Sequence, residues 1–405
     1  MAVRTRQGHG VNEDDFAWLR QVVWGQDQLG SVGPSMRYVV APSISRPWFV
    51  LPWLGFVPTV RVALDGWGRL SDRHRMIRSI GVMKATGAVL HLSSTVDLPA
   101  TPPLLVWLRD QLGVPVSGAV ITGVKDPNRK PTVQVVGRAG DTLGWAKVGW
   151  SPATREMVLR ERAMLDRIGP RLAEDPHLRV PGVIAGGSVG GSEVLVTRPM
   201  PARSRRWGKG AEPPRADLLR AIARSASASG RLHEGQLAGL PLWAQLSERV
   251  AAVADLAPTA AAAVEDAVRD AAGSASPTAT VPIGGWHGDL APWNLARRGD
   301  EVWLWDWEHA GDGRPLGLDL LHYQLVVSLY VRRTDPATAL RELVVGAPGL
   351  LRPLGIDEHA ARAVTVAYLA ERWLRAAELA RHGASWDETV HPAIPDVLSS
   401  LTSKP

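Results

Sequence analysis

Two neighbouring segments near residue 300 constrain this chain more than any other part of it. Residues 286–294 read Trp-His-Gly-Asp-Leu-Ala-Pro-Trp-Asn, and residues 302–307 read Val-Trp-Leu-Trp-Asp-Trp. In the second segment Val302, Leu304 and Asp306 alternate with tryptophans, which is the period of a half-buried strand. A carboxylate at the end of such a strand is costly to bury unless a cation or hydrogen bonds meet it. The pattern therefore predicts a loop and a strand that hold Asp306 against a partner.

Three oxygen-bearing side chains of these segments fit metal-assisted phosphoryl transfer. Asp289 would accept the proton of a substrate hydroxyl, while Asn294 and Asp306 would hold Mg²⁺ through oxygen atoms, the ligands that small hard cations prefer. His287 would brace the loop. Taken alone, Asp289 could equally be an ordinary surface acid, but the ordered set favours a catalytic site.

The motif His-Gly-Asp, four residues, then Asn, followed by Leu-Trp-Asp-Trp-Glu, resembles the aminoglycoside phosphotransferase and choline-kinase family, small-molecule relatives of the protein kinases. By this resemblance Asp289 is the catalytic base, Asn294 and Asp306 are the metal ligands, and Asp319 buttresses the loop. His287 is assigned to the catalytic site together with Asp289. The resemblance implies an α+β, protein-kinase-like, two-lobed fold. Such a fold has a small antiparallel-sheet lobe and a mainly helical large lobe, here with an additional N-terminal α/β region.

The strand and helix patterns divide the chain near residues 113 and 200. Residues 1–113 form the N-terminal region of unknown role, residues 114–200 the small lobe and hinge, and residues 201–405 the helical large lobe with the catalytic loop. Strands are expected at residues 36–41, 49–52, 59–64, 88–92, 116–124, 132–136 and 142–150. Helices are expected at residues 102–112, 154–168, 217–232, 242–256, 260–272, 315–333 and 357–382.

Lys147 is the informative residue of the predicted small lobe. It lies in a strand with apolar residues on both faces, so its ammonium group needs a partner or must reach solvent. Glu161 falls within the apolar stripe of the helix predicted at residues 154–168, and Glu156 is the alternative partner. By the family resemblance, a pair of Lys147 with Glu161 would steady the lysine against the phosphates of a nucleotide.

The loop that would cover those phosphates departs from the pattern of the kinase fold. No Gly-x-Gly-x-x-Gly motif is present. Gly118, Gly123 and the turn at residues 125–130 are the candidate replacements, with Arg129 or Lys130 in place of backbone donors. This departure leaves the choice of phosphoryl donor open between ATP and GTP.

The family resemblance also suggests where a purine would bind. In the family the backbone of the interlobe hinge contacts the base, and the matching residues are Val196, Thr197 and Arg198. A second hypothesis, suggested by the missing glycine motif, is a catalytically silent nucleotide-binding regulator (a pseudokinase) on the same fold. The presence of the base and both metal ligands favours an active kinase.

A small hydroxylated acceptor is expected rather than a protein substrate. Gly288 stands where protein kinases commonly have an arginine, and Asp306 lies too close to Asp319 for a long activation segment. A further likeness to phosphotransferase-like proteins of bacterial surface-polysaccharide pathways suggests a sugar or polysaccharide precursor, whereas the basic chain disfavours a cationic drug. Candidate residues of the acceptor pocket are Glu308, His309, His322, Tyr323, Glu371, Arg372 and Trp373.

Composition narrows the partners and the location. The net charge of +6 could suit nucleic acid, but no nucleic-acid module is recognisable, and an anionic nucleotide also favours a positive cleft. The basic stretch at residues 198–209 is best explained as a solvated loop. With no cysteine, no secretory signal and no apolar run of bilayer length, the chain is expected to be cytoplasmic and without a transmembrane segment. The sequence leaves its oligomeric state open.

Overall fold

The computed structural model describes residues 14–25, 34–65, 94–122, 129–173, 175, 177–201, 204–208, 212–276, 278–382 and 390–402. The chain forms two compact units. The first, called the sheet unit, comprises Met1–Lys125, Arg129–Arg162 and Pro181–Arg203; the second, called the helical unit, comprises Asp126–Asn128, Ala163–Val180 and Ser204–Pro405. The strand predicted at residues 88–92 and most of the turn predicted at residues 125–130 lie outside the described residues.

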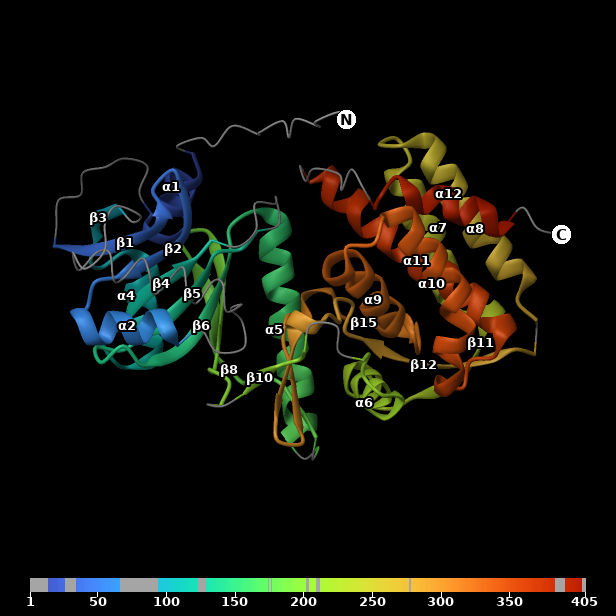
Figure 1. The fold of residues 1–405 in the computed structure, drawn as a ribbon, viewed down its shortest axis with the longest axis horizontal. Coiled ribbons are helices and arrows are strands. Elements are labelled where there is room, and N and C mark those ends of the chain that lie inside the picture. Colours follow the sequence, from blue (N-terminus) through green and yellow to red (C-terminus); the bar gives the residue numbers. More distant parts are fainter. Residues whose placement is uncertain are drawn as a thin grey trace. The chain divides into compact units, whose positions relative to one another are not determined.

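Eight antiparallel strands form one continuous sheet in the sheet unit (Figure 1). Their order is β3-β1-β2-β4-β5-β6-β9-β8. The strands are β1 (Ser35–Ser43), β2 (Arg46–Pro52), β3 (Ser94–Pro99), β4 (Ser117–Ile121), β5 (Thr132–Val136), β6 (Thr142–Gly149), β8 (Val183–Val189) and β9 (Ser192–Thr197). Except for 59–64 and 88–92, each strand predicted in this region overlaps one of them.

The boundary predicted at residue 113 needs correction. β2 pairs directly with β4, with Phe49 opposite Ile121 and Val50 opposite Val120. The N-terminal strands therefore extend the same sheet that the predicted small lobe forms, and the hydrogen-bonded ladder runs across the expected division. Short strand patterns could not reveal this, because they give the positions of strands but not their neighbours.

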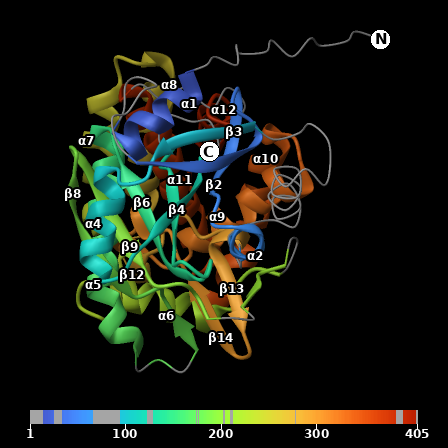
Figure 2. The ribbon, with the colours of Figure 1, turned by 90° about the vertical axis from the view of Figure 1, so that its left-hand side faces the viewer.

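Helices cover both faces of this sheet (Figure 2). One face, which includes Val40 and Val50, packs against α1 (Asp14–Leu19), η1 (Arg20–Trp24) and α4 (Pro103–Leu112). The other face, which includes Val39 and Leu51, packs against α2 (Phe56–Leu64). Alternate residues of each strand thus enter different cores, as the pleat requires.

The strand predicted at residues 59–64 is wrong, because this segment is the end of helix α2. Its β-branched composition favoured a strand. In the structure the helix buries Thr59, Val62 and Ala63, whose spacing places them on one face of a helix. Burial of that stripe against the sheet therefore outweighs the local preference for a strand.

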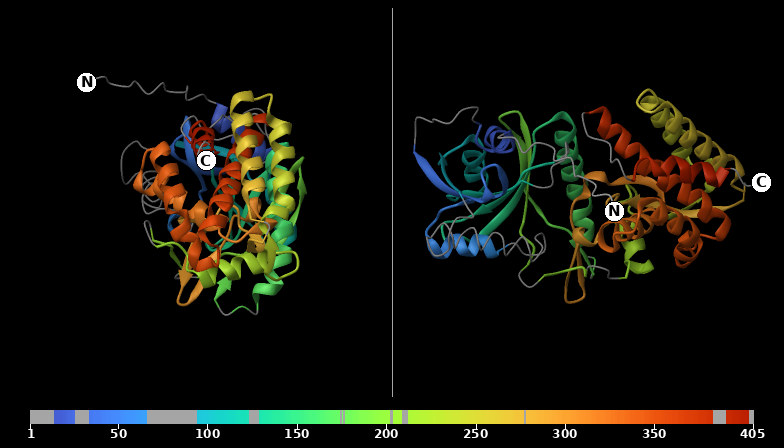
Figure 3. Two further views of the ribbon diagram at one scale, coloured as in Figure 1. Left: turned by 90° about the vertical axis from the view of Figure 1, so that its right-hand side faces the viewer. Right: turned by 45° about the horizontal axis from the view of Figure 1, so that its top comes forward.

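Helices make up most of the helical unit, and α11 lies at their centre (Figure 3). α11 (Glu358–Arg381) contacts α7 (Pro241–Val253), α8 (Pro258–Ser274), α9 (Leu318–Val326), α10 (Pro336–Leu351) and α12 (Ala393–Thr402). The remaining helices are α6 (Ala216–Ala226), η2 (Leu237–Gly239), η3 (Pro292–Asn294), η4 (Trp307–His309), η5 (Val327–Arg332) and η6 (Arg352–Leu354), and α5 (Pro152–Ala173) has residues in both units. The helices predicted in this part of the chain are confirmed, except that the helix predicted at residues 217–232 ends at Ala226; α10 and α12 were not predicted.

Two smaller sheets complete the helical unit and flank the loop at residues 287–291. One has the order β10-β13-β14-β7 and the other β11-β12-β15. Their strands are β7 (Leu178–Arg179), β10 (Arg205–Arg206), β11 (His233–Gln236), β12 (Thr280–Trp286), β13 (Leu295–Arg298), β14 (Glu301–Leu304) and β15 (Gly311–Pro315). The predicted α+β class, with one sheet-rich and one mainly helical unit, is confirmed. Among the described helices, none combines the length and apolarity needed to cross a membrane.

Candidate active site

The loop that follows β12 is fixed by Asp319, the second residue of α9. The backbone N–H groups of His287 and Gly288 donate to the two oxygens of the Asp319 carboxylate at 2.8 and 2.9 Å. Burial raises the pKa of Asp319 to about 6, although the two N–H donors oppose this shift. The buttressing contact implied by the family resemblance is therefore present.

Gly288 is required at its position by both backbone conformation and space. Its φ angle is 81°, in the left-handed region that favours glycine. A Cβ atom there would lie 2.1 Å from the carbonyl oxygen of His309. An arginine, which protein kinases commonly carry here, could not fit without moving this backbone.

His287 braces the loop from within and does not reach solvent. Its side chain is fully buried, with Nε2 3.0 Å from the carbonyl oxygen of Trp305 and Nδ1 accepting from the backbone N–H of Asp289 at 3.2 Å. The ring also packs on Trp307, with centroids 4.5 Å apart. Burial lowers the pKa of His287 to about 4. These contacts lie where the sequence predicted that His287 would brace the loop, while its membership of the catalytic site stays a prediction.

Asp289 presents a partly exposed carboxylate held from two sides. The side chain is 33% exposed. Oδ2 accepts a hydrogen bond from Nδ2 of Asn294 at 2.9 Å, and Oδ1 lies 3.1 Å from Nε2 of His322. Burial alone would raise the pKa of Asp289, but the bond from His322 and the charges of His309 and Arg375 together hold that pKa below its usual range. The carboxylate is thus ionised, oriented and accessible.

Asn294 and Asp306 lie together at the open end of one hairpin. β13 and β14 pair Leu295 with Leu304, and the backbone N–H of Trp305 donates to the carbonyl oxygen of Asn294 at 3.3 Å. The alternating pattern predicts that Asp306 belongs to the strand, but β14 ends at Leu304. Asp306 follows it with a left-handed φ of 66°. Few non-glycine residues adopt that conformation, and those that do are often functional.

The oxygen atoms of Asn294 and Asp306 supply only part of the coordination that a hard cation needs. Nδ2 of Asn294 is used in bonds to the side chain and the backbone of Asp289, which leaves its Oδ1 as the atom to meet a cation. No group of three or more His, Cys, Asp or Glu residues in the described part of the chain could hold a metal ion. Mg²⁺ commonly binds through one or two protein oxygens plus substrate phosphates, and Asn294 with Asp306 suits that mode.

The sheet unit holds the predicted ion pair. Lys147 lies on β6, opposite Thr132 of β5 and Leu195 of β9, and its ammonium group contacts the carboxylate of Glu161 on α5. The two side chains are only 9% and 3% exposed. Glu156, the alternative partner, instead pairs with Arg160 on the surface. The prediction of Lys147 with Glu161 is confirmed as a contact.

The hinge prediction is only partly compatible with the structure. Val196 lies within β9 and pairs with β6 and β8 on both sides, and Thr197 ends that strand. The backbone N–H of Arg198 donates to the carbonyl oxygen of Gly182 at 2.8 Å. This amide is therefore occupied and cannot also bind a purine.

The candidate phosphate-covering residues are also engaged elsewhere. Arg129 donates to Asp15 at 2.8 Å and stacks on Trp18, with its guanidinium carbon 3.8 Å from the ring centre. Lys130 places Nζ 3.4 Å from the sulfur of Met157. Gly118 lies inside β4, where a Cβ atom would come within 2.9 Å of Val133. Gly123 and residues 125–128 lie outside the described part of the chain.

Of the predicted acceptor residues, only His322 directly contacts Asp289. Its Nδ1 lies 3.2 Å from the hydroxyl of Tyr368, so α9 and α11 each contribute a residue to the hydrogen-bond chain behind Asp289. Glu371 is held by Arg249 at 2.7 Å, and the Trp373 ring stacks on His391. Tyr368 was missed because α11 is buried around most of its surface and gives no polar stripe that would mark one side.

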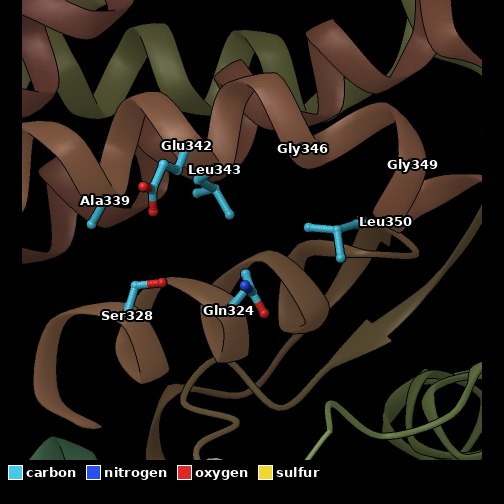
Figure 4. Close-up of a pocket in the computed structure, with 8 residues that line it drawn as sticks. All are labelled: Gln324, Ser328, Ala339, Glu342, Leu343, Gly346, Gly349 and Leu350. Atoms are coloured by element: carbon cyan, nitrogen blue, oxygen red, sulfur yellow. The ribbon is translucent and has the colours of Figure 1, made fainter. Parts of the chain in front are cut away.

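A separate cavity of about 270 Å³ lies between the helix of α9 and η5 and helix α10 (Figure 4). Gln324 and Ser328 face Glu342 and Leu343 across it. The remaining lining residues are Ala339, Gly346, Gly349 and Leu350. No residue of the catalytic loop lines this cavity, so it is not part of the candidate site.

The comparisons with known proteins find kinases among solved structures. No family model matches the chain, and no curated protein does. A candidate fructosamine-3-kinase from Thermobifida fusca YX-ER1 is 15% identical, with 74% of this chain and 98% of that chain covered and a TM-score of 0.42. A glucosamine kinase in complex with glucosamine, ADP and inorganic phosphate is 17% identical, with coverage of 76% and 87% and a TM-score of 0.32.

The ADP-bound aminoglycoside phosphotransferase APH(2'')-Ib is 10% identical, with 74% of this chain and 95% of that chain covered and a TM-score of 0.33. Structures of small-molecule kinases are therefore among those to which this chain is similar, as the motif resemblance led us to expect. At these identities and scores, neither activity nor substrate follows from the similarity.

Proposed function

We propose that this protein is a small-molecule kinase that transfers the γ-phosphoryl group of ATP or GTP to a hydroxyl group of a sugar or polysaccharide precursor. The observation that carries the proposal is the exposure, hydrogen bonding and ionisation of the Asp289 carboxylate. Its carboxylate is partly exposed, held by two side-chain hydrogen bonds and lowered in pKa. Its ionised form, its fixed orientation and its accessibility suit a proton acceptor, which must be unprotonated and within hydrogen-bond reach of the substrate hydroxyl.

Each predicted site residue has a part in the proposed reaction. Asp289 orients the hydroxyl of the acceptor and takes its proton as the new oxygen–phosphorus bond forms, while the bond from the γ-phosphorus to the bridging oxygen breaks and the nucleoside diphosphate leaves. Asn294 and Asp306 are the residues that would hold Mg²⁺, and a bound Mg²⁺ would neutralise charge on the nucleotide phosphates. Lys147, kept in place by Glu161, would bind those phosphates as a positive charge. His287 and Asp319 keep the loop in shape.

The experiment supplies the protein with Mg²⁺, with γ-labelled ATP or GTP, and with a panel of sugars, amino alcohols and nucleosides. Phosphoryl transfer is measured as an increase in the mass of the acceptor. Wild type is compared with Asp289→Asn and Asp306→Asn, and the exposed Asp300→Asn serves as a control. We expect turnover in wild type and control, and loss of about 10²–10⁴-fold in Asp289→Asn, because a positioned general base contributes that much.

The alternative is a nucleotide-binding regulator without turnover. The absence of a glycine motif and the occupied Arg198 amide favour it. Nucleotide binding by wild type, Asp289→Asn and Asp306→Asn alike, with no transfer or hydrolysis by any of them, would replace the kinase proposal with this one.

A further inference from the structure

One face of α11 points toward the candidate base. The hydroxyl of Tyr368 lies 3.2 Å from Nδ1 of His322, and Nε2 of His322 lies 3.1 Å from Oδ1 of Asp289. Arg372 and Arg375 follow Tyr368 by four and seven residues. Side chains at this spacing lie on the same face of a helix. The two guanidinium groups therefore belong to the face that supports the base.

A second contact places Arg375 beside the catalytic loop. Its guanidinium carbon lies 5.6 Å from the centre of the Trp286 ring, and Trp286 immediately precedes His287. The positive charge of Arg375 contributes to the lowered pKa of Asp289, and burial lowers the pKa of Arg375 itself. The arginine is thus close enough to the base to influence it and is partly withdrawn from water.

Asp289 and Glu371 act on Arg375 through their charges, but neither arginine has a directly bonded anionic partner in the part of the chain that the structure describes. No hydrogen bond or ion pair joins Arg372 or Arg375 to another described residue, and Nε of Arg372 is buried without a partner. The carboxylates available on the same helix are occupied, since Arg249 contacts both Glu371 and Glu378 at 2.7 Å. A guanidinium group that is partly withdrawn from water and has no directly bonded anion is unfavourable, so this pair is suited to a ligand that supplies one.

The two carboxylate oxygens of Asp289 face different parts of the candidate site, one toward the predicted metal ligands and the other toward the helix that carries the arginines. Oδ2 faces Asn294, a candidate metal ligand, whereas Oδ1 faces His322, which in turn contacts the arginine-bearing helix. Nucleotide phosphates belong on the metal side. The arginines are therefore placed to meet the other substrate, whose hydroxyl group must approach the exposed carboxylate.

We propose that Arg372 and Arg375 bind an anionic group, a carboxylate or a phosphate, carried by the hydroxylated acceptor; this inference rests on the proposed kinase function. The planar guanidinium group matches both anions and can form two parallel hydrogen bonds to either. A sugar acid or a phosphorylated sugar would thus be preferred over a neutral sugar. A cationic acceptor would be repelled by the same pair.

The test compares matched acceptors that differ in one anionic group. Glucose is paired with glucuronate, and glycerol with glycerol 3-phosphate, each with γ-labelled ATP and Mg²⁺. Wild type should use at least one anionic acceptor better than its neutral partner. Arg372→Gln and Arg375→Gln should raise the KM for that acceptor by about 10- to 100-fold, because a hydrogen bond to a charged group is lost. The KM for ATP should change by less than about 3-fold.

The control is Arg362→Gln on the same helix, where Arg362 forms an exposed ion pair with Asp270 at 3.2 Å. Arg375→Lys, which keeps the charge, should recover part of the affinity. Thermal unfolding of each variant separates loss of binding from loss of folding. Equal use of charged and neutral acceptors, or an increase in the KM for ATP in place of that for the acceptor, would overturn the inference.

Binding measurements keep the two proposals distinguishable. If wild type transfers phosphate to no acceptor, the kinase proposal fails, and calorimetric titration with glucuronate and glycerol 3-phosphate then decides the role of the arginines. Binding that Arg375→Gln weakens would support an anion site without turnover. Absence of binding by both anions would reject that site.

Discussion

At the scale of single residues, His322 connects the candidate base to a second helix. Its Nε2 lies beside Asp289 and its Nδ1 beside Tyr368, a pattern that assigns the proton to Nε2 and leaves Nδ1 as acceptor. Burial lowers the pKa of His322, so the ring is neutral at pH 7 while it donates this bond. We therefore regard His322 as a positioning residue for the base.

Replacing His322 with alanine should change the pH dependence of turnover. The hydrogen bond from His322 lowers the pKa of Asp289, so its loss should raise that pKa and move the acid limb of the kcat profile to higher pH. We expect kcat at pH 7 to fall by about 10- to 100-fold with little change in the KM for ATP. Gln324→Ala, on the same helix but facing the separate cavity, is the control. An unshifted acid limb would show that His322 does not act on the base.

His287 should make stability depend on pH in a defined direction. Burial lowers its folded-state pKa from 6.5 to about 4, so below about pH 6.5 the unfolded chain binds a proton that the folded chain does not. The stability that neutral His287 provides is present above that pH and is lost as the pH falls toward 4. At roughly 1.4 kcal/mol per pKa unit, the difference between 6.5 and about 4 corresponds to a loss on the order of 3–4 kcal/mol.

The measurement is urea unfolding of wild type and His287→Gln between about pH 7.5 and 4.5. Wild type should be the more stable at neutral pH, and the difference should shrink as the pH falls. Asp319, whose pKa is raised to about 6, acts in the opposite direction but is present in both proteins. A difference that stays constant with pH would mean that His287 is not held neutral.

At the scale of elements, the ion pair between β6 and α5 should behave as a coupled unit. Removing one partner leaves a buried charge uncompensated, which costs about 3–5 kcal/mol, whereas replacing both with methionine should cost less than the sum. We predict that Lys147→Met and Glu161→Met each lower the free energy of unfolding by that amount. Additive losses in the double variant would argue against the contact. Arg160→Met tests the exposed pair with Glu156 and should change stability by less than about 1 kcal/mol.

The sequence predicted those features of the site that depend on local spacing. Lys147 with Glu161, and Asn294 near Asp289, follow from the period of a strand, a helix or a short loop. The contacts of Tyr368 and Arg375 could not be predicted, because they depend on which face the buried helix α11 turns toward Asp289. Likewise, the hydrogen bond from the backbone N–H of Arg198 to the carbonyl oxygen of Gly182 depends on how two strands pair, and no local sequence pattern encodes that pairing.

At the scale of the whole molecule, the continuity of the eight-stranded sheet sets the smallest chain that can fold. A protein that begins at residue 114 would lack β1, β2 and β3 and would expose the edge of β4 and the cores on both faces of the sheet. We predict that such a fragment is recovered as aggregates, because unpaired apolar edges associate. A protein that lacks only residues 1–13, which precede the first described helix, should remain monodisperse in size-exclusion chromatography. A soluble, cooperatively unfolding fragment from residue 114 would show that the N-terminal strands are dispensable.

The pairing of Phe49 with Ile121 has a consequence for how this protein can diverge. These residues lie on strands 72 positions apart in sequence but directly opposite each other in the sheet. A larger side chain on one strand then requires a smaller one across from it. Among homologous chains, substitutions at these two positions should be correlated, and the N-terminal strands should be inherited together with the rest of the sheet.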